Sequence, residues 1–130
     1  MRAPEPLHGT RFVAAPPVLD AQPSRDDDAI PRTLIRLAPD NLLVIHPGSI
    51  VVALGDEPLI QEKEAGFVGW WLTPEELAQV VTHVDWPLPT ERPALAQGLV
   101  AGVPAKLWLA EERALLLCAA AYAHELEARL

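Results

Sequence analysis

The chain has 130 residues, of which 50% are hydrophobic and 22% are charged, and 18 acidic against 10 basic residues give a formal net charge of −8. This length and composition fit one soluble globular domain with a hydrophobic core. Nucleic acids and anionic membrane surfaces select proteins with a surplus of basic residues. We therefore expect neither nucleic acid nor a membrane as a partner.

No segment of the sequence is typical of a membrane span or a secretion signal. The longest uninterrupted apolar run, residues 114–123, is shorter than the about 18 to 20 residues that cross a bilayer. Pro4, Pro6 and Pro16 interrupt the apolar character of the N-terminal region, which does not read as a secretory signal. Cys118 is the only cysteine, which excludes an intrachain disulfide. We therefore expect a cytoplasmic protein.

The first 31 residues are rich in proline and contain the acidic run Asp26-Asp27-Asp28. Each proline removes a backbone donor and fixes its own φ, which discourages regular structure. This composition predicts a flexible arm over residues 1–31 and a single domain over residues 32–130. The alternative is an arm that lies along the domain or a partner, anchored by apolar side chains. These anchors would be Leu7, Phe12, Val13, Val18 and Leu19.

Short aliphatic segments separated by turn signals predict an antiparallel meander between residues 33 and 72. Ala38-Pro39-Asp40-Asn41 is typical of a type I turn and predicts the first hairpin. In the last segment, alternation would place Trp70 and Trp71 on opposite faces, so both faces need to be covered. The predicted strands are residues 33–37, 42–46, 50–54, 59–63 and 66–72.

The sequence Thr73-Pro74-Glu75-Glu76 predicts the start of a helix. Thr73 can cap the helix, Pro74 fits the first helical position, and Glu76 completes a capping box. Apolar residues recur at helical spacing up to Val84, and Pro87 makes continuation unfavourable. We expect this helix to end near Val84.

The remaining sequence predicts a hairpin and a closing helix. Residues 94–101 and 105–109 read as two strands about Gly102-Val103-Pro104. Abundant alanine and leucine, acids at the start and Arg129 near the end favour a helix over residues 114–130. The predicted fold is α+β: an antiparallel meander sheet with a central helix, a further hairpin and a C-terminal helix packed on the sheet.

His46, His83 and Asp85 are the candidate metal ligands of the sequence. Zinc needs three or four convergent ligands, and His83 and Asp85 would lie about 200° apart on a helix. The two converge only if the helix ends between them. The more economical interpretation places them on the surface, and we predict no metal and no cofactor.

Other patterns of catalytic residues are absent from the sequence. Cys118 lies in the most apolar segment, where burial makes a thiol inert, and His124 is about 240° away around a helix. Neither Ser24 nor Ser49 lies in a Gly-x-Ser-x-Gly elbow, and no glycine-rich phosphate loop occurs. The sequence therefore favours a protein without catalysis.

Four tryptophans among seven aromatic residues are many for this chain. Large aromatic side chains dominate both protein cores and the hot spots of interfaces. We expect a small non-catalytic interaction or adaptor module that self-associates, with a homodimer as the expected form. The alternatives are a small-molecule-binding or client-escort domain and, less favoured, a small metal-dependent enzyme built around His46, His83 and Asp85. The candidate interaction residues are Phe67, Trp70, Trp71, Trp86, Trp108 and Tyr122.

Overall fold

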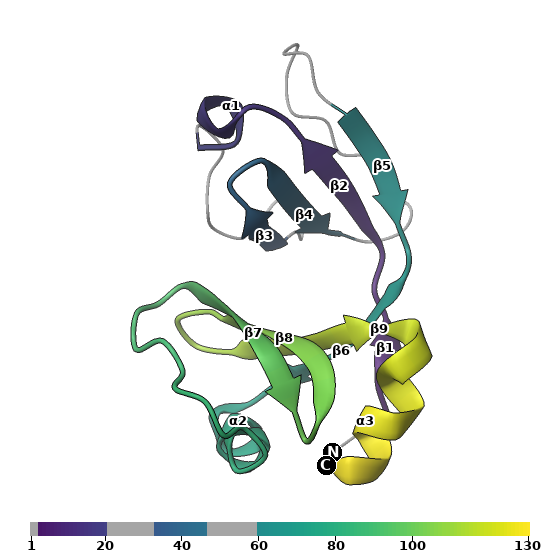
Figure 1. Cartoon of the computed structure of the whole chain (residues 1–130), viewed down its shortest axis with the longest axis vertical. Coiled ribbons are helices and arrows are strands. Elements are labelled where there is room, and N and C mark those ends of the chain that lie inside the picture. The colour runs from purple at the N-terminus through teal and green to yellow at the C-terminus, as the bar shows by residue number, and fades with distance from the viewer. Residues whose placement is uncertain (1–2, 21–32, 47–59) are drawn as a thin grey trace. The chain divides into compact units, whose positions relative to one another are not determined.

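The computed structural model describes residues 3–20, 33–46 and 60–130, which form two antiparallel sheets with few helices (Figure 1). This content fits an α+β or mostly-β fold. Contacts divide the chain into two compact units. Unit 1 comprises Met1–Pro6 and Gly66–Leu130, and unit 2 comprises Leu7–Ala65. The sequence predicted an antiparallel meander sheet with a further hairpin, whereas the described residues form two sheets, one in each unit.

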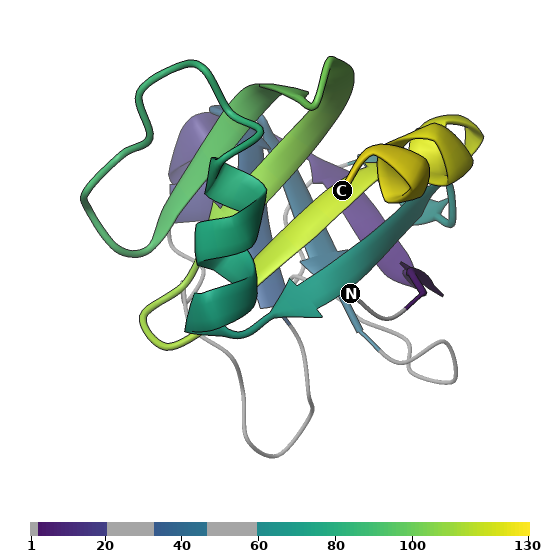
Figure 2. The same cartoon turned by 90° about the horizontal axis from the view of Figure 1, so that it is seen from below.

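Unit 1 is built on a five-stranded sheet in the order β1-β6-β9-β8-β7. Its strands are β1 (Glu5–Pro6), β6 (Phe67–Leu72), β7 (Ala94–Val100), β8 (Val103–Leu109) and β9 (Ala114–Ala119). Its helices are α2 (Pro74–Val81), the 3₁₀ helix η1 (Ala120–Tyr122) and α3 (Ala123–Arg129). Figure 2 shows α2 and α3 over the same face of this sheet. Within the described residues, no helix has the length and apolar character needed to cross a membrane.

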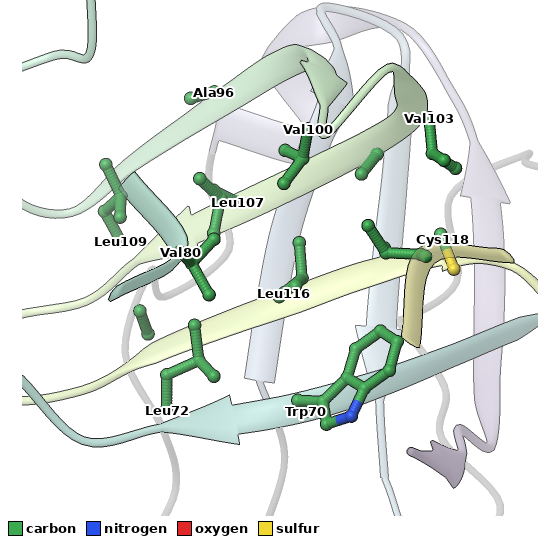
Figure 3. Close-up of a cluster of buried hydrophobic side chains, with 13 residues drawn as sticks. Trp70, Leu72, Val80, Ala96, Val100, Val103, Leu107, Leu109, Leu116 and Cys118 are labelled. Carbon is green, nitrogen blue, oxygen red and sulfur yellow. The ribbon is translucent and has the colours of Figure 1, made fainter. Parts of the chain in front are cut away.

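The core of unit 1 lies between its helices and one face of the sheet. Val80 of α2 and Leu126 of α3 pack with Trp70, Leu107 and Leu116 from three different strands. Figure 3 shows that the strand side chains of this cluster point to one side of the sheet. Full burial of one such aliphatic side chain contributes about 1.5–3 kcal/mol, so this face provides much of the stability of the unit.

The predicted helix start and the predicted hairpin of unit 1 are confirmed. Thr73 Oγ1 accepts a hydrogen bond from the Glu76 amide at 3.2 Å, and Glu76 Oε1 accepts one from the Thr73 amide at 3.1 Å. Strands β7 and β8 pair from Val100 and Val103 onward, so their turn is Ala101-Gly102, one residue earlier than predicted. Both turn residues have positive φ, which glycine adopts without strain.

The prediction of a helix over residues 114–130 is wrong for its first part. Residues 114–119 form β9, which pairs with β6 on one side and β8 on the other. Leu115, Leu116 and Leu117 are fully buried, although successive residues of a strand point to opposite faces. A strand buried on both faces is a continuous apolar run, which has no period-2 pattern that distinguishes it from a buried helix.

Unit 2 is a four-stranded sheet in the order β3-β4-β2-β5. Its elements are β2 (Gly9–Val13), α1 (Pro16–Asp20), β3 (Thr33–Ala38), β4 (Asn41–Ile45) and β5 (Ile60–Glu64). The predicted hairpin of β3 and β4 is confirmed. Phe12, Leu19 and Leu42 belong to its core, and Arg36 Nη2 donates to Asp20 Oδ1 at 2.7 Å, which ties α1 to β3.

Part of the predicted N-terminal arm is regular structure in both units. Strand β1 pairs with β6, and β2 pairs with β4 and β5, with Phe12 completely buried. The prolines are compatible with this because Pro6 ends a short edge strand and Pro16 opens a helix, where a missing N–H costs little. The division between the units falls at residues 6 and 65. The rest of the arm, its predicted end at residue 31 and the predicted strand 50–54 lie outside the described residues.

Candidate functional site

Unit 1 carries a hollow of about 350 Å³ on the sheet face opposite α2 and α3. The register of the strands explains its position. Leu99 of β7 lies opposite Pro104 of β8, and Phe67 of β6 lies opposite Ala119 of β9. Since alternate residues share a face, all four belong to the face that the helices leave uncovered. The hollow is lined by Phe67, Gln97, Gly98, Leu99, Pro104, Ala105, Lys106, Leu117, Cys118, Ala119 and Tyr122.

Side-chain size explains why this part of the sheet is hollow. The small residues Pro104 and Ala119 occupy the middle strands, whereas Phe67 and Leu99 stand on the flanking strands. The ladder between β8 and β9 ends at the pair of Lys106 and Leu117. Pro104 has no N–H with which to continue this ladder, so β8 and β9 part at the floor of the hollow.

The rim of the hollow exposes large apolar side chains. Leu99 is 52% exposed and Tyr122, which follows β9 in η1, is 43% exposed. In the part of the chain that the structure describes, Ile60 is the only other exposed large hydrophobic residue, at 58%. Exposed apolar side chains that gather at one place on a surface make that place a candidate contact site for another molecule.

One polar pair lies within this apolar lining. Lys106 and Gln97 are directly opposite each other on β8 and β7, and Lys106 Nζ donates to Gln97 Oε1 at 2.9 Å. Lys106 is the only charged residue among the described residues that line the hollow. The hollow therefore combines apolar walls with one positive charge.

The predicted aromatic residues have different environments. Phe67 and Tyr122 line the hollow. Trp70 and Trp108 are buried, with exposed fractions of 2% and 8%. The ring of Trp71 stacks with a cation, since Arg113 Cζ lies 3.8 Å from its centroid. The site is thus built from only part of the predicted aromatic set.

Trp86 supports the strand that carries Leu99. Its indole Nε1 donates to the Leu99 carbonyl oxygen at 2.8 Å, and its ring packs against the core of unit 1. A second hydrogen bond lies nearby: the Ala101 amide donates to the His83 carbonyl oxygen at 2.9 Å. The segment after α2 therefore contacts β7, the outer strand of the described sheet, and fixes the rim residue Leu99.

Sequence reasoning missed Leu99, Pro104 and Lys106 as site residues. The predicted hairpin of residues 94–101 and 105–109 contained the signal, because alternation along its second strand puts Lys106 and Trp108 on one face. Pairing the hairpin in register would have added Gln97 and Leu99 to this face. The contributions of β6 and β9 could not be found in this way, because β9 was assigned to a helix.

The candidate metal ligands do not form a cluster in the described residues. His46 Nε2 lies 2.8 Å from Thr10 Oγ1 in unit 2, whereas His83 and Asp85 follow α2 in unit 1. Residues 3–20, 33–46 and 60–130 contain no group of three or more His, Cys, Asp or Glu side chains that could hold a metal ion. Burial of the Cys118 side chain raises the pKa of its thiol, which disfavours the reactive thiolate.

Comparisons of the chain with protein-family models, with curated proteins and with solved structures give no match. The geometry of the hollow is therefore the basis for a functional assignment.

Proposed function

We propose that this chain is a non-catalytic protein-interaction module that self-associates, and that the hollow of unit 1 is its docking site. The observation that carries the proposal is the position of Leu99 and Tyr122. Two of the three exposed large hydrophobic residues in the described chain stand on the rim of the same hollow.

The composition of the rim supports docking of a protein. Interface hot spots are enriched in aromatic residues that surround a desolvated pocket, and charged residues are few at their centre. Phe67 and Tyr122 supply aromatic surface, Leu99 supplies an aliphatic wall, and Lys106 is the single charge. A partner that inserts an apolar side chain would bury all three apolar groups at once.

The self-association of Leu99→Ser and Tyr122→Ser tests this proposal by sedimentation velocity over a range of protein concentrations. Each substitution should raise the dissociation constant about fivefold or more, because a hot-spot side chain contributes more than about 1 kcal/mol. Gln79→Ser on the exposed side of α2 is the matched control and should behave as the wild type. A wild-type protein that stays monomeric, or rim variants that associate like the control, would contradict the proposal.

A small-molecule-binding domain is the second candidate. The volume of about 350 Å³ is within the range of about 300–1,000 Å³ typical of ligand pockets, and the pair of Lys106 and Gln97 could orient a polar group. Native mass spectrometry of the freshly purified protein separates the two functions. A stoichiometric adduct that Leu99→Ser removes favours the ligand, whereas a dimer without adduct favours the interaction module.

A further inference from the structure

Strand β5 of unit 2 presents an apolar side chain and an acid on one side of an exposed strand. It is an edge strand of its sheet, and Ile60 is the most exposed large hydrophobic residue of the described chain, at 58%. Glu62 is also exposed and follows Ile60 by two residues. Residues two apart in a strand point to the same side, about 7 Å from each other.

The hollow of unit 1 also has an apolar residue and a charged residue two positions apart on one strand, and its charge is opposite to that of Glu62. Pro104, at its apolar floor, and Lys106, its single charge, are also two residues apart on one strand. An extended strand that inserts an apolar side chain above Pro104 therefore brings its next same-side residue to Lys106. On β5 that next residue is the acid Glu62, so the apolar and charged groups of β5 follow each other in the same order as those of the hollow.

We propose that Ile60 of a second copy of this chain occupies the hollow and that Glu62 of that copy forms an ion pair with Lys106. The inference rests on the proposed function and names the partner of the same site. Each contact joins the hollow of one copy to the strand of another. Since the chain carries a net charge of −8, two copies repel each other overall, and a local pair of opposite charges selects the productive orientation.

Two charge reversals test the contact. In Lys106→Glu a negative hollow meets the negative Glu62 of another copy, and in Glu62→Lys a positive strand meets the positive Lys106. Each variant alone should self-associate about tenfold or more weakly than the wild type, because like charges face each other in every contact. Mixed in equal amounts, the two variants should combine, since each hollow then meets a strand of opposite charge.

The overall charge predicts a different result for one variant. Glu62→Lys lowers the net negative charge, so general repulsion alone would make this variant associate more strongly than the wild type. The matched controls are Lys63→Glu, on the other side of β5, and Glu91→Lys, in the exposed segment before β7. Lys63→Glu makes the same change of charge as Lys106→Glu, and Glu91→Lys makes the same change as Glu62→Lys, in each case outside the contact. Both controls should leave self-association within about twofold of the wild type.

Sedimentation velocity of the single variants and of their mixture distinguishes the outcomes. Recovery of association in the mixture supports the inference, and it also shows that both variants are folded. If Leu99→Ser weakens association but the charge reversals do not, or the mixture stays dissociated, the contact with β5 is wrong while the proposed function stands. A monomeric wild type overturns both. Ile60→Ser is an independent test. Because Ile60 is exposed, this substitution should weaken association without affecting folding.

Discussion

The indole of Trp86 lies so close to Gly98 that a Cβ atom at residue 98 would be 2.7 Å from its Cε2 atom. The same indole donates a hydrogen bond to the carbonyl oxygen of Leu99. Glycine is therefore required at residue 98 by the approach of the ring. The pair connects the segment after α2 to the outer strand of the sheet, directly beside the rim of the hollow.

Gly98→Ala should destabilise the protein by about 1–3 kcal/mol, as overpacking typically does, because the new methyl group overlaps the Trp86 ring. The free energy of unfolding in urea measures this loss. In a Trp86→Ala background the same substitution should cost less than about 0.5 kcal/mol, since the overlapping ring is gone. An equal cost in both backgrounds would show that the ring is not the cause.

Thr73→Ala should destabilise the protein by about 1 kcal/mol, because it removes the side-chain acceptor of the capping box at the start of α2. Urea denaturation again gives the free energy of unfolding. Thr90→Ala, at an exposed position in the segment before β7, is the control and should change it by less than about 0.5 kcal/mol. A similar loss in the two variants would contradict the capping role.

Two leucines separate the stability of unit 1 from its proposed docking site. Leu116 is fully buried in the core of unit 1, so Leu116→Ala should cost about 2–5 kcal/mol of unfolding free energy. Leu99 is 52% exposed, so Leu99→Ala should change this free energy by less than about 0.5 kcal/mol and act on self-association instead. Equal destabilisation by both substitutions would mean that Leu99 belongs to the core.

Stability should fall at alkaline pH through Cys118. Burial raises the pKa of this thiol, so in the unfolded chain it loses its proton at lower pH than in the folded protein. The buried neutral thiol contributes to the stability of the folded protein. This contribution is fully present below the pKa of the thiol in the unfolded chain, about 8.5, and is lost as the pH rises through the pKa of the thiol in the folded protein.

Urea denaturation at increasing pH measures this loss, and Cys118→Ala should lack that part of the pH dependence. Alkylation by iodoacetamide, followed by mass spectrometry, should be slower in the folded protein than in urea. Equal rates of alkylation would show that the thiol is accessible.

The parts of the fold that depend on neighbouring residues could be predicted from the sequence. The capping box at Thr73 and the turn at Pro39 are encoded within about four residues, and both are present. The alternation that placed Trp70 and Trp71 on opposite faces also holds, because Trp70 points into the core of unit 1 with the helices.

The hollow could not be predicted because it depends on pairing between distant segments. Phe67 and Ala119 become neighbours only through the pairing of β6 with β9, and Leu99 enters through β7. The prediction failed where alanine and leucine propensities favoured a helix, since burial between two neighbouring strands overrides propensity. Pairing between distant strands is thus the reason why the helix prediction at β9 is wrong and why the hollow could not be predicted.

The central position of β9 has a consequence for the order of folding during synthesis. All strands that the structure describes in unit 2 end by Glu64, so its sheet can form before the second half of the chain is made. In unit 1, β6 has only the two residues of β1 as a partner until Ala114–Ala119 is synthesised. Synthesis runs from the N-terminus, and pairing between distant segments is slow. The tryptophan-rich strand β6 therefore waits for its full-length neighbour until Ala114–Ala119 is made, and a chaperone that covers its apolar side chains in that interval would protect the nascent chain.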